Sequence, residues 1–121
     1  MRPKINPDIM KFKKPGKFLQ AKFRYLKENK KYRSVEDLAN DLGYTRRGIV
    51  YMIFSGECII QLKDMALYKK AFNLTEAEVE RLVLLVCYNK ADNIYEKRIF
   101  RGALKVTPKR MSLQAYRRPL L

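Results

Sequence analysis

Histidine is absent from this chain of 121 residues, and cysteine occurs only as Cys58 and Cys87. Zinc sites in proteins usually take four ligands from these two residue types, so a zinc finger is excluded. Most acid–base and nucleophilic enzymes rely on histidine, and neither paired carboxylates nor a glycine-rich phosphate loop replaces it here. We therefore expect a protein that is not an enzyme and needs no metal or cofactor. The two cysteines are expected to be buried thiols, with a single disulfide as the alternative.

Long apolar segments are also absent. The longest, residues 83–88, is far shorter than the roughly 20 residues that span a bilayer. The first ten residues contain no apolar core of a secretory signal. A chain of this length has room for one domain with a single core. We therefore expect one domain that does not enter a membrane and remains in the cytoplasm.

Positive charge is abundant and lies at both ends of the chain. The formal net charge is +15. Residues 1–33 carry 12 basic and 2 acidic residues, residues 34–96 carry 7 and 10, and residues 97–121 carry 8 and none. Blocks of like charge are usually interaction segments, and their commonest ligand is a nucleic-acid backbone. A membrane surface or an acidic protein is the alternative.

The spacing of apolar residues predicts an all-α chain. Three prolines and five basic residues in positions 1–16 predict an extended basic arm. Apolar residues at helical spacing then predict helices over residues 17 to about 30, 35–42, 46–54, 62–71, 76–89 and 93–105, with Thr107 and Pro108 ending the last. We expect residues 17–91 to form the globular domain and residues 92–121 to form a C-terminal helix and basic tail.

Local signals support several of these helix ends. Ser34 and Thr45 are typical N-cap residues for the second and third helices. Gly43 is placed between them, where a positive φ costs glycine little. Thr75 and Glu78 have the spacing of a capping box at the start of the fifth helix.

In the third helix, Ile49 is expected to be the centre of the buried face, with Met52 and Ile53 beside it. The side chains expected to point outward are Arg47, Val50, Tyr51 and Phe54. No role is evident for an outward Phe54.

The segment LANDLGYTRRGIVYMIFSG, residues 38–56, resembles the helix-turn-helix of the phage-repressor family, the Cro/C1/Xre type. Within that family it is closest to the N-terminal domain of an uncharacterised group of Xre-like bacterial proteins. The resemblance covers about residues 17–90 and implies a five-helix domain, here with an extra C-terminal helix. The chain departs from the family at Val35, where glutamine is common, and at Phe54, where an acidic residue is common.

The resemblance implies that the third helix enters the major groove of double-stranded DNA. It places Arg46, Arg47 and Tyr51 where the family has its base-contacting residues. Arginine can bind guanine through two hydrogen bonds, and Gly48 would permit a close approach to the groove. The alternative is that both arginines touch only phosphate or water, and that Tyr51 packs under the following loop.

The N-termini of both helices of the hairpin would point at the DNA backbone, where free N–H groups bind phosphate. The lysines of residues 11–17 could follow the backbone or the adjacent minor groove. The candidate backbone contacts are Arg33, Ser34, Thr45, Lys63, Lys11, Lys13, Lys14 and Lys17.

Apolar residues are interleaved with the basic ones in the C-terminal tail, including Phe100, Met111, Leu113 and Tyr116. Apolar residues of this kind mark contact surfaces. A partner subunit is the first expectation, because proteins of this type usually bind DNA as homodimers. A nucleic-acid groove or another protein is the alternative.

These features together predict a sequence-specific transcription regulator, a repressor in the first instance, associated with the nucleoid. Two other functions stay open. An architectural protein that coats DNA with little sequence preference would use the same basic ends. An interaction module of a larger nucleoprotein assembly would use the tails to bind protein.

Overall fold

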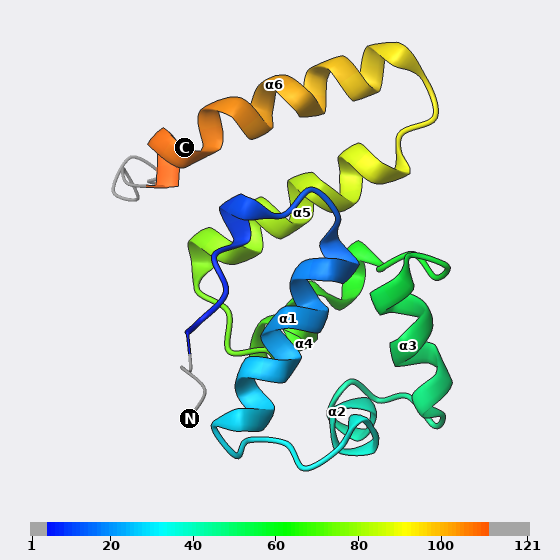
Figure 1. The fold of residues 1–121 in the computed structure, drawn as a ribbon. Helices are drawn as coiled ribbons and strands as arrows, with labels where there is room; N and C mark the ends of the chain where they lie inside the picture. Colours follow the sequence, from blue (N-terminus) through cyan, green and yellow to red (C-terminus); the bar gives the residue numbers. More distant parts are fainter. Residues whose placement is uncertain (1–4, 112–121) are drawn as a thin grey trace.

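The computed structural model describes residues 5–111, which form six α-helices and two short 3₁₀ helices and contain no strand (Figure 1). The prediction of an all-α chain is confirmed. None of these helices is long and apolar enough to cross a membrane. In chain order the elements are η1 Ile9–Lys11, α1 Pro15–Glu28, α2 Val35–Asp41, α3 Arg47–Ser55, η2 Leu62–Asp64, α4 Met65–Ala71, α5 Glu76–Lys90 and α6 Ile94–Met111.

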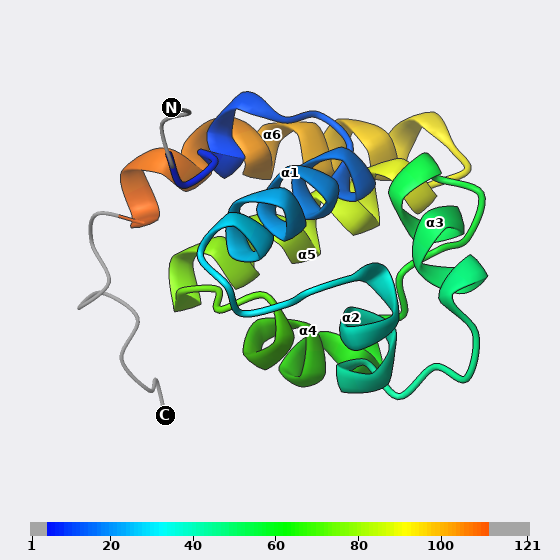
Figure 2. The same cartoon turned by 60° about the horizontal axis from the view of Figure 1, so that its bottom comes forward.

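The helices are arranged around α1, which crosses the middle of the molecule (Figure 1, Figure 2). On one side α5 contacts α1, and α6 turns back to lie on the outer side of α5. On the other side α3 contacts both α1 and α2, while α4 contacts α2 and α5. Apolar side chains from five helices fill the core, among them Phe18, Leu19, Phe23, Leu38, Val50, Tyr68, Leu82 and Leu85.

Side-chain capping fixes the start of α5 and shapes the start of α2. The Thr75 hydroxyl accepts a hydrogen bond from the Glu78 N–H at 3.1 Å, and the Glu78 carboxylate accepts one from the Thr75 N–H at 2.9 Å. The predicted capping box is therefore confirmed. Ser34 is the N-cap residue of α2 as predicted, but its side chain makes no capping bond. Instead the Asp37 carboxylate accepts from the N–H of Arg33 at 2.9 Å.

The turn between α2 and α3 is two residues longer than predicted, because α2 ends at Asp41 and α3 begins at Arg47. Gly43 has a φ of +80°, the left-handed conformation expected for it. Tyr44 then packs against the core. The helix α3 begins at Arg47, with Arg46 as its N-cap residue, so the prediction that Thr45 caps this helix is wrong.

The N-terminal segment packs against the domain, so the prediction of an extended arm is wrong for residues 5–14. Asp8 caps η1 by accepting a hydrogen bond from the Met10 N–H at 3.0 Å. Ile9 is buried in the core, and the ring of Phe12 lies edge-on to Phe18 with centroids 5.7 Å apart. Ile9 and Phe12, which lie between Pro7 and Pro15, therefore anchor this segment to the core. Residues 1–4 lie outside the described range.

A buried lysine ties the N-terminal segment to α1 and α5. Lys22 lies in the middle of the core face of α1 and is only 2% exposed, although lysine is a charged residue. Its ammonium donates a hydrogen bond to the side chain of Asn6 at 2.5 Å and lies 3.9 Å from the Glu78 carboxylate. Burial lowers the pKa of the Lys22 ammonium below its ordinary value of 10.5, and the Glu78 carboxylate opposes that shift.

The last helix continues beyond its predicted end. Thr107 and Pro108 were expected to stop it, but α6 runs to Met111. Proline has no N–H, so the carbonyl of Leu104, four residues before Pro108, has no helical donor. The guanidinium of Arg81 on α5 donates to that carbonyl at 2.6 Å and satisfies it. The expected tail contacts of residues 112–121 lie outside the described range.

Gly16 lets α1 and α3 approach each other closely. A Cβ atom added to this glycine would clash with the backbone carbonyl oxygen of Ile53 and lie 2.8 Å from that of Phe54. Both carbonyls belong to the C-terminal turn of α3, and backbone atoms cannot move aside as a flexible side chain can. A side chain at residue 16 would therefore push the two helices apart.

Replacing Gly16 with alanine is expected to lower the free energy of unfolding by roughly 1–3 kcal/mol, the usual cost of overpacking a core. Gly48→Ala is the matched control, because Gly48 also lies in a helix but has open space around it. The control is expected to be neutral or stabilising by up to about 1 kcal/mol. Urea-induced unfolding followed by circular dichroism measures both. Equal midpoints for the two variants would contradict the close contact.

Replacing Lys22 with methionine is expected to destabilise the protein by about 1–3 kcal/mol at pH 7, because Asn6 loses its hydrogen bond and the Glu78 carboxylate loses its partner. The charged form of Lys22 is less stable in the folded protein than in the unfolded chain, because burial disfavours it. This penalty on the native protein is complete below the lowered pKa and vanishes as the pH rises to about 10.5.

The native protein should therefore gain stability as the pH rises from 7 to about 10.5, and the gap by which it exceeds Lys22→Met should widen. Urea unfolding across this range measures the gap. Lys17→Met is the control, because Lys17 lies on the exposed face of the same helix. A gap that stays constant with pH would show that the charge of Lys22 carries no penalty in the fold.

Candidate nucleic-acid interface

Three apolar side chains form the buried face of α3. Val50, Ile53 and Phe54 have the spacing of a single helical stripe, and each is at most 5% exposed. The ring of Phe54 packs beside that of Phe23 on α1, with centroids 6.0 Å apart. This stripe therefore sets the rotation of α3 about its own axis.

The prediction of which α3 residues are buried was partly wrong. Ile53 is buried as expected, but Val50 and Phe54 are also buried and Met52 is exposed. Ile49 is half-buried at the edge of the core. Two overlapping apolar stripes are present in this segment. One consists of Ile49, Met52 and Ile53, and the other of Val50, Ile53 and Phe54. The second is buried, because the large Phe54 ring buries more surface against α1.

The α2–α3 hairpin is also fastened to α4. The hydroxyls of Tyr44, in the turn, and Tyr68, on α4, are hydrogen-bonded at 2.8 Å. Burial raises the pKa of the Tyr68 hydroxyl well above its usual range, and the bond to Tyr44 adds to this effect. The Tyr68 phenol is therefore neutral at physiological pH, and its hydrogen bond to Tyr44 joins the turn to the core.

The outer face of α3 carries the residues predicted to contact bases. Arg46 and Arg47 at its start are exposed, and Tyr51, one turn further along, is 52% exposed. Gly48 lies beside them, with open space where a side chain would be. The structure thus brings the three predicted residues together on one exposed surface.

Arg47 is paired with an acidic residue of α2. Its guanidinium lies 3.1 Å from the Glu36 carboxylate, and both side chains are more than 60% exposed. An ion pair so open to water contributes at most about 1 kcal/mol. A phosphate or a guanine edge could therefore displace Glu36 at small cost.

The structure separates the predicted backbone contacts into two groups. One group lies in and around the hairpin: Arg33 and Ser34 precede α2, Thr45 is in the turn, and Lys63 is in η2. Arg33 is exposed, with its guanidinium 3.6 Å from the Asp37 carboxylate. The second group comes from the N-terminal segment and the start of α1: Lys11, Lys13, Lys14 and Lys17.

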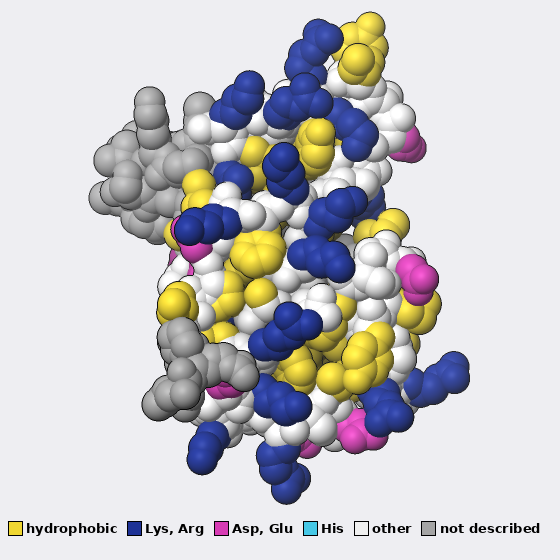
Figure 3. All heavy atoms as spheres, viewed as in Figure 1, with side chains coloured by type: hydrophobic (Ala, Val, Ile, Leu, Met, Phe, Trp, Pro, Cys, Tyr) yellow, Lys and Arg dark blue, Asp and Glu magenta, His cyan; other side chains and the backbone are white. Residues whose placement is uncertain are grey.

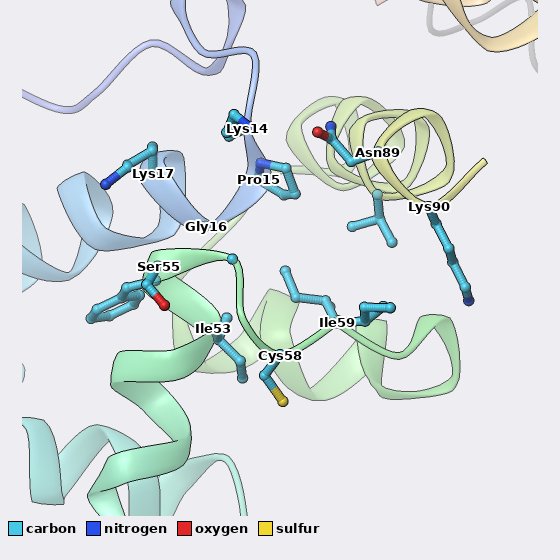
Figure 4. A pocket seen from close by; sticks show the side chains of 14 residues that line it. Lys14, Pro15, Gly16, Lys17, Ile53, Ser55, Cys58, Ile59, Asn89 and Lys90 are labelled. Carbon is cyan, nitrogen blue, oxygen red and sulfur yellow. The ribbon is translucent and has the colours of Figure 1, made fainter. Parts of the chain in front are cut away.

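Two of these lysines line a pocket where α1, α3 and α5 meet (Figure 4). Lys14 and Lys17 contribute from the start of α1, and Lys90 contributes from the end of α5. Ser55 and Asn89 add polar groups, and the volume is about 270 Å³. In Figure 4 Lys17 lies on the helix at the left, with its side chain directed away from the centre of the pocket, and Lys90 extends from the end of α5 at the right.

A second group of basic side chains surrounds Tyr88 of α5. The ammonium of Lys97 lies 4.7 Å from the centre of the Tyr88 ring, and the guanidinium of Arg101 lies 5.9 Å from it. Arg101 also donates to the Tyr88 hydroxyl at 3.3 Å. This hydrogen bond lowers the pKa of Tyr88, and the positive charges of Arg101, Lys97 and Lys13 lower it further.

Sequence reasoning missed Lys90, Lys97 and Arg101 as members of a site. They are far from Lys14 and Lys17 in the sequence and gather only through packing of α5 between α1 and α6. A signal was present, because the loop between α5 and α6 is only three residues long. Short helix connections imply antiparallel neighbours, which would have placed Tyr88 next to Lys97.

No cluster of three or more metal-ligating side chains occurs among residues 5–105. Cys58 and Cys87 are free thiols as expected, although each is half-buried rather than buried, and the alternative of a disulfide between them is wrong. Comparison of the chain with protein-family models, with curated proteins and with solved structures finds no match. The geometry and charge of the chain itself are therefore the basis for a functional proposal.

Proposed function

We propose that this chain is a sequence-specific DNA-binding regulator of transcription, built as a helix-turn-helix domain of the Cro/C1 type. The observation that carries the proposal is the outer face of α3, which presents Arg46, Arg47 and Tyr51 beside a glycine. The opposite face is fixed in the core by Val50 and Phe54. A helix held in this way is a rigid element that the major groove of DNA can accommodate.

The chemistry of the exposed side chains suits base reading. Arginine can donate two hydrogen bonds to the O6 and N7 atoms of guanine, which is worth about 1–3 kcal/mol of discrimination. Gly48 leaves room for the base edges to approach the helix backbone. The Glu36 carboxylate would release Arg47 on binding, because the pair is exposed and weak.

A homodimer would present two copies of α3 one helical turn of DNA apart, about 34 Å. The surface proposed for pairing is the exposed apolar stripe of α6. Tyr95 and Ile99 lie one helical turn apart and are 72% and 66% exposed. Gly102, one turn further along, has open space around it, so a second helix could come close.

An architectural DNA-binding protein is the second candidate. The observation that favours it is the number of basic side chains remote from α3, around the pocket of Lys14, Lys17 and Lys90 and around Tyr88. Such groups bind any duplex through counterion release. Both candidates place the protein on the nucleoid.

Selection of binding sites from a random duplex library tests the proposed function. A selected sequence that is preferred at about 150 mM salt supports the regulator, whereas equal binding of all duplexes supports the architectural protein. Arg47→Ala should relax the preference at one position of each half-site and weaken binding by about 1–3 kcal/mol. Arg33→Ala, at the exposed pair before α2, is the control and should keep the base preference. Unchanged preference in Arg47→Ala would remove this residue from the reading surface.

Replacing Ile99 with glutamate should abolish pairing, because it puts two like charges into the proposed α6 interface. Sedimentation velocity on the free protein and on its complex with a selected site measures the change. Leu67→Glu is the control, because Leu67 is an exposed apolar residue of α4, outside this stripe. A dimer that survives Ile99→Glu would place the interface elsewhere.

A further inference from the structure

A basic surface covers the junction of the N-terminal segment, the end of α5 and α6. Figure 3 shows Lys and Arg side chains gathered over α6 and over the N-terminal end of α1, with few acidic side chains between them. Three parts of the chain that are distant in sequence contribute to it. We define the basic surface by six residues: Lys13, Lys14, Lys17, Lys90, Lys97 and Arg101.

These charges are not neutralised by the ion pairs found between described residues. Those pairs use Lys22, Arg33, Arg47 and Lys69 as their cations. Instead, Lys97 and Arg101 contact Tyr88, and Lys14, Lys17 and Lys90 line the pocket. Gathered like charges repel one another, and a bound polyanion relieves that repulsion.

Hydrogen bonds hold the parts of the surface in fixed positions. The side chain of Asn89 donates to the carbonyl of Lys13 at 3.2 Å and to that of Leu85 at 2.8 Å, so the N-terminal segment is tied to α5. The ammonium of Lys97 donates to the carbonyl of Tyr88 at 3.1 Å, which ties α6 to α5. The charges are therefore displayed on a rigid scaffold.

We infer that the basic surface binds the sugar–phosphate backbone of the same duplex whose major groove receives α3, an inference that rests on the proposed function. Ser55 and Gly56, at the C-terminal end of α3, line the pocket together with Lys14 and Lys17. The nine residues of α3 span about 13 Å, which is well under one turn of duplex at about 34 Å. The pocket end of the basic surface is therefore within one helical turn of duplex from the start of α3, close enough for one duplex to contact both.

The placement of the basic residues favours a nucleic acid over a lipid surface. A helix that binds a membrane interface inserts an apolar face that lies opposite its basic face. Four of the six members of the basic surface lie outside α6, in the N-terminal segment, α1 and α5, so the charge does not follow one amphipathic helix. The exposed apolar residues of α6, Tyr95 and Ile99, form the stripe that is proposed for pairing, and a partner subunit would cover it.

The test removes charge from the pocket without changing α3. The triple variant Lys14→Gln, Lys17→Gln, Lys90→Gln is compared with the native protein on a labelled duplex of mixed sequence at about 50–200 mM salt. Each lost phosphate contact should reduce the slope of log affinity against log salt by about 0.9, so the slope should fall by about 2–3. The base preference found by site selection should stay as in the native protein.

The matched control is Lys27→Gln, Lys30→Gln, Lys70→Gln, which removes three exposed charges near the other end of α1. A slope that falls equally in both variants would show a general effect of net charge and overturn the inference. So would an unchanged slope in the pocket variant. If the pocket variant shows an altered circular dichroism spectrum, Lys13→Gln, Arg101→Gln takes its place, with an expected fall of about 2.

Failure of the inference and failure of the proposed function give different results. An unchanged slope with an intact base preference overturns the basic surface alone. Binding to vesicles of phosphatidylserine and phosphatidylcholine, without binding to any duplex, overturns both. A reduced slope in the pocket variant without any base preference supports the basic surface and favours the architectural protein.

Discussion

The close contact between Gly16 and the end of α3 is the constraint on which the geometry of the site depends. Two helix ends meet there, the N-terminal end of α1 and the carbonyls of Ile53 and Phe54. The partial charges of these ends are opposite, so their approach is favourable. Because the helices touch backbone to backbone, Val50 and Phe54 reach the core and the opposite face of α3 remains outside. The exposure of Arg47 and Tyr51 is thus a consequence of a missing side chain in another helix.

A second constraint is that one carboxylate, that of Glu78, interacts with both the start of α5 and the Lys22 ammonium. Glu78 closes the capping box of α5 with one oxygen and approaches the Lys22 ammonium with the other. Lys22 in turn holds Asn6 of the N-terminal segment. The start of α5, the middle of α1 and the N-terminal segment are therefore coupled through a buried polar group. This coupling makes residues 5–14 part of the domain and positions Lys13 and Lys14 next to α5.

The sequence was sufficient to locate the helices, because their ends carry local signals such as Thr75, Glu78 and Gly43. It was not sufficient to set the rotation of α3, since two apolar stripes overlap and only docking on α1 decides between them. The role of Phe54 follows from that docking. Likewise the continuation of α6 through Pro108 depends on a hydrogen bond from Arg81, a residue 23 positions before the carbonyl that it satisfies. Local periodicity contains no information about such distant contacts, which also explains why the basic surface was missed.

Under the proposed function, base reading and affinity lie in different parts of the molecule. The outer face of α3 carries only two of the 27 basic residues, and one of them is already paired with Glu36. Most of the electrostatic attraction must therefore come from elsewhere, and counterion release from backbone contacts is the term that dominates non-specific affinity. A large non-specific term lowers the specificity ratio unless the base contacts are geometrically strict. The rigid seating of α3 between α1 and α2 meets that requirement, because a helix that could rock would contact several bases equally well.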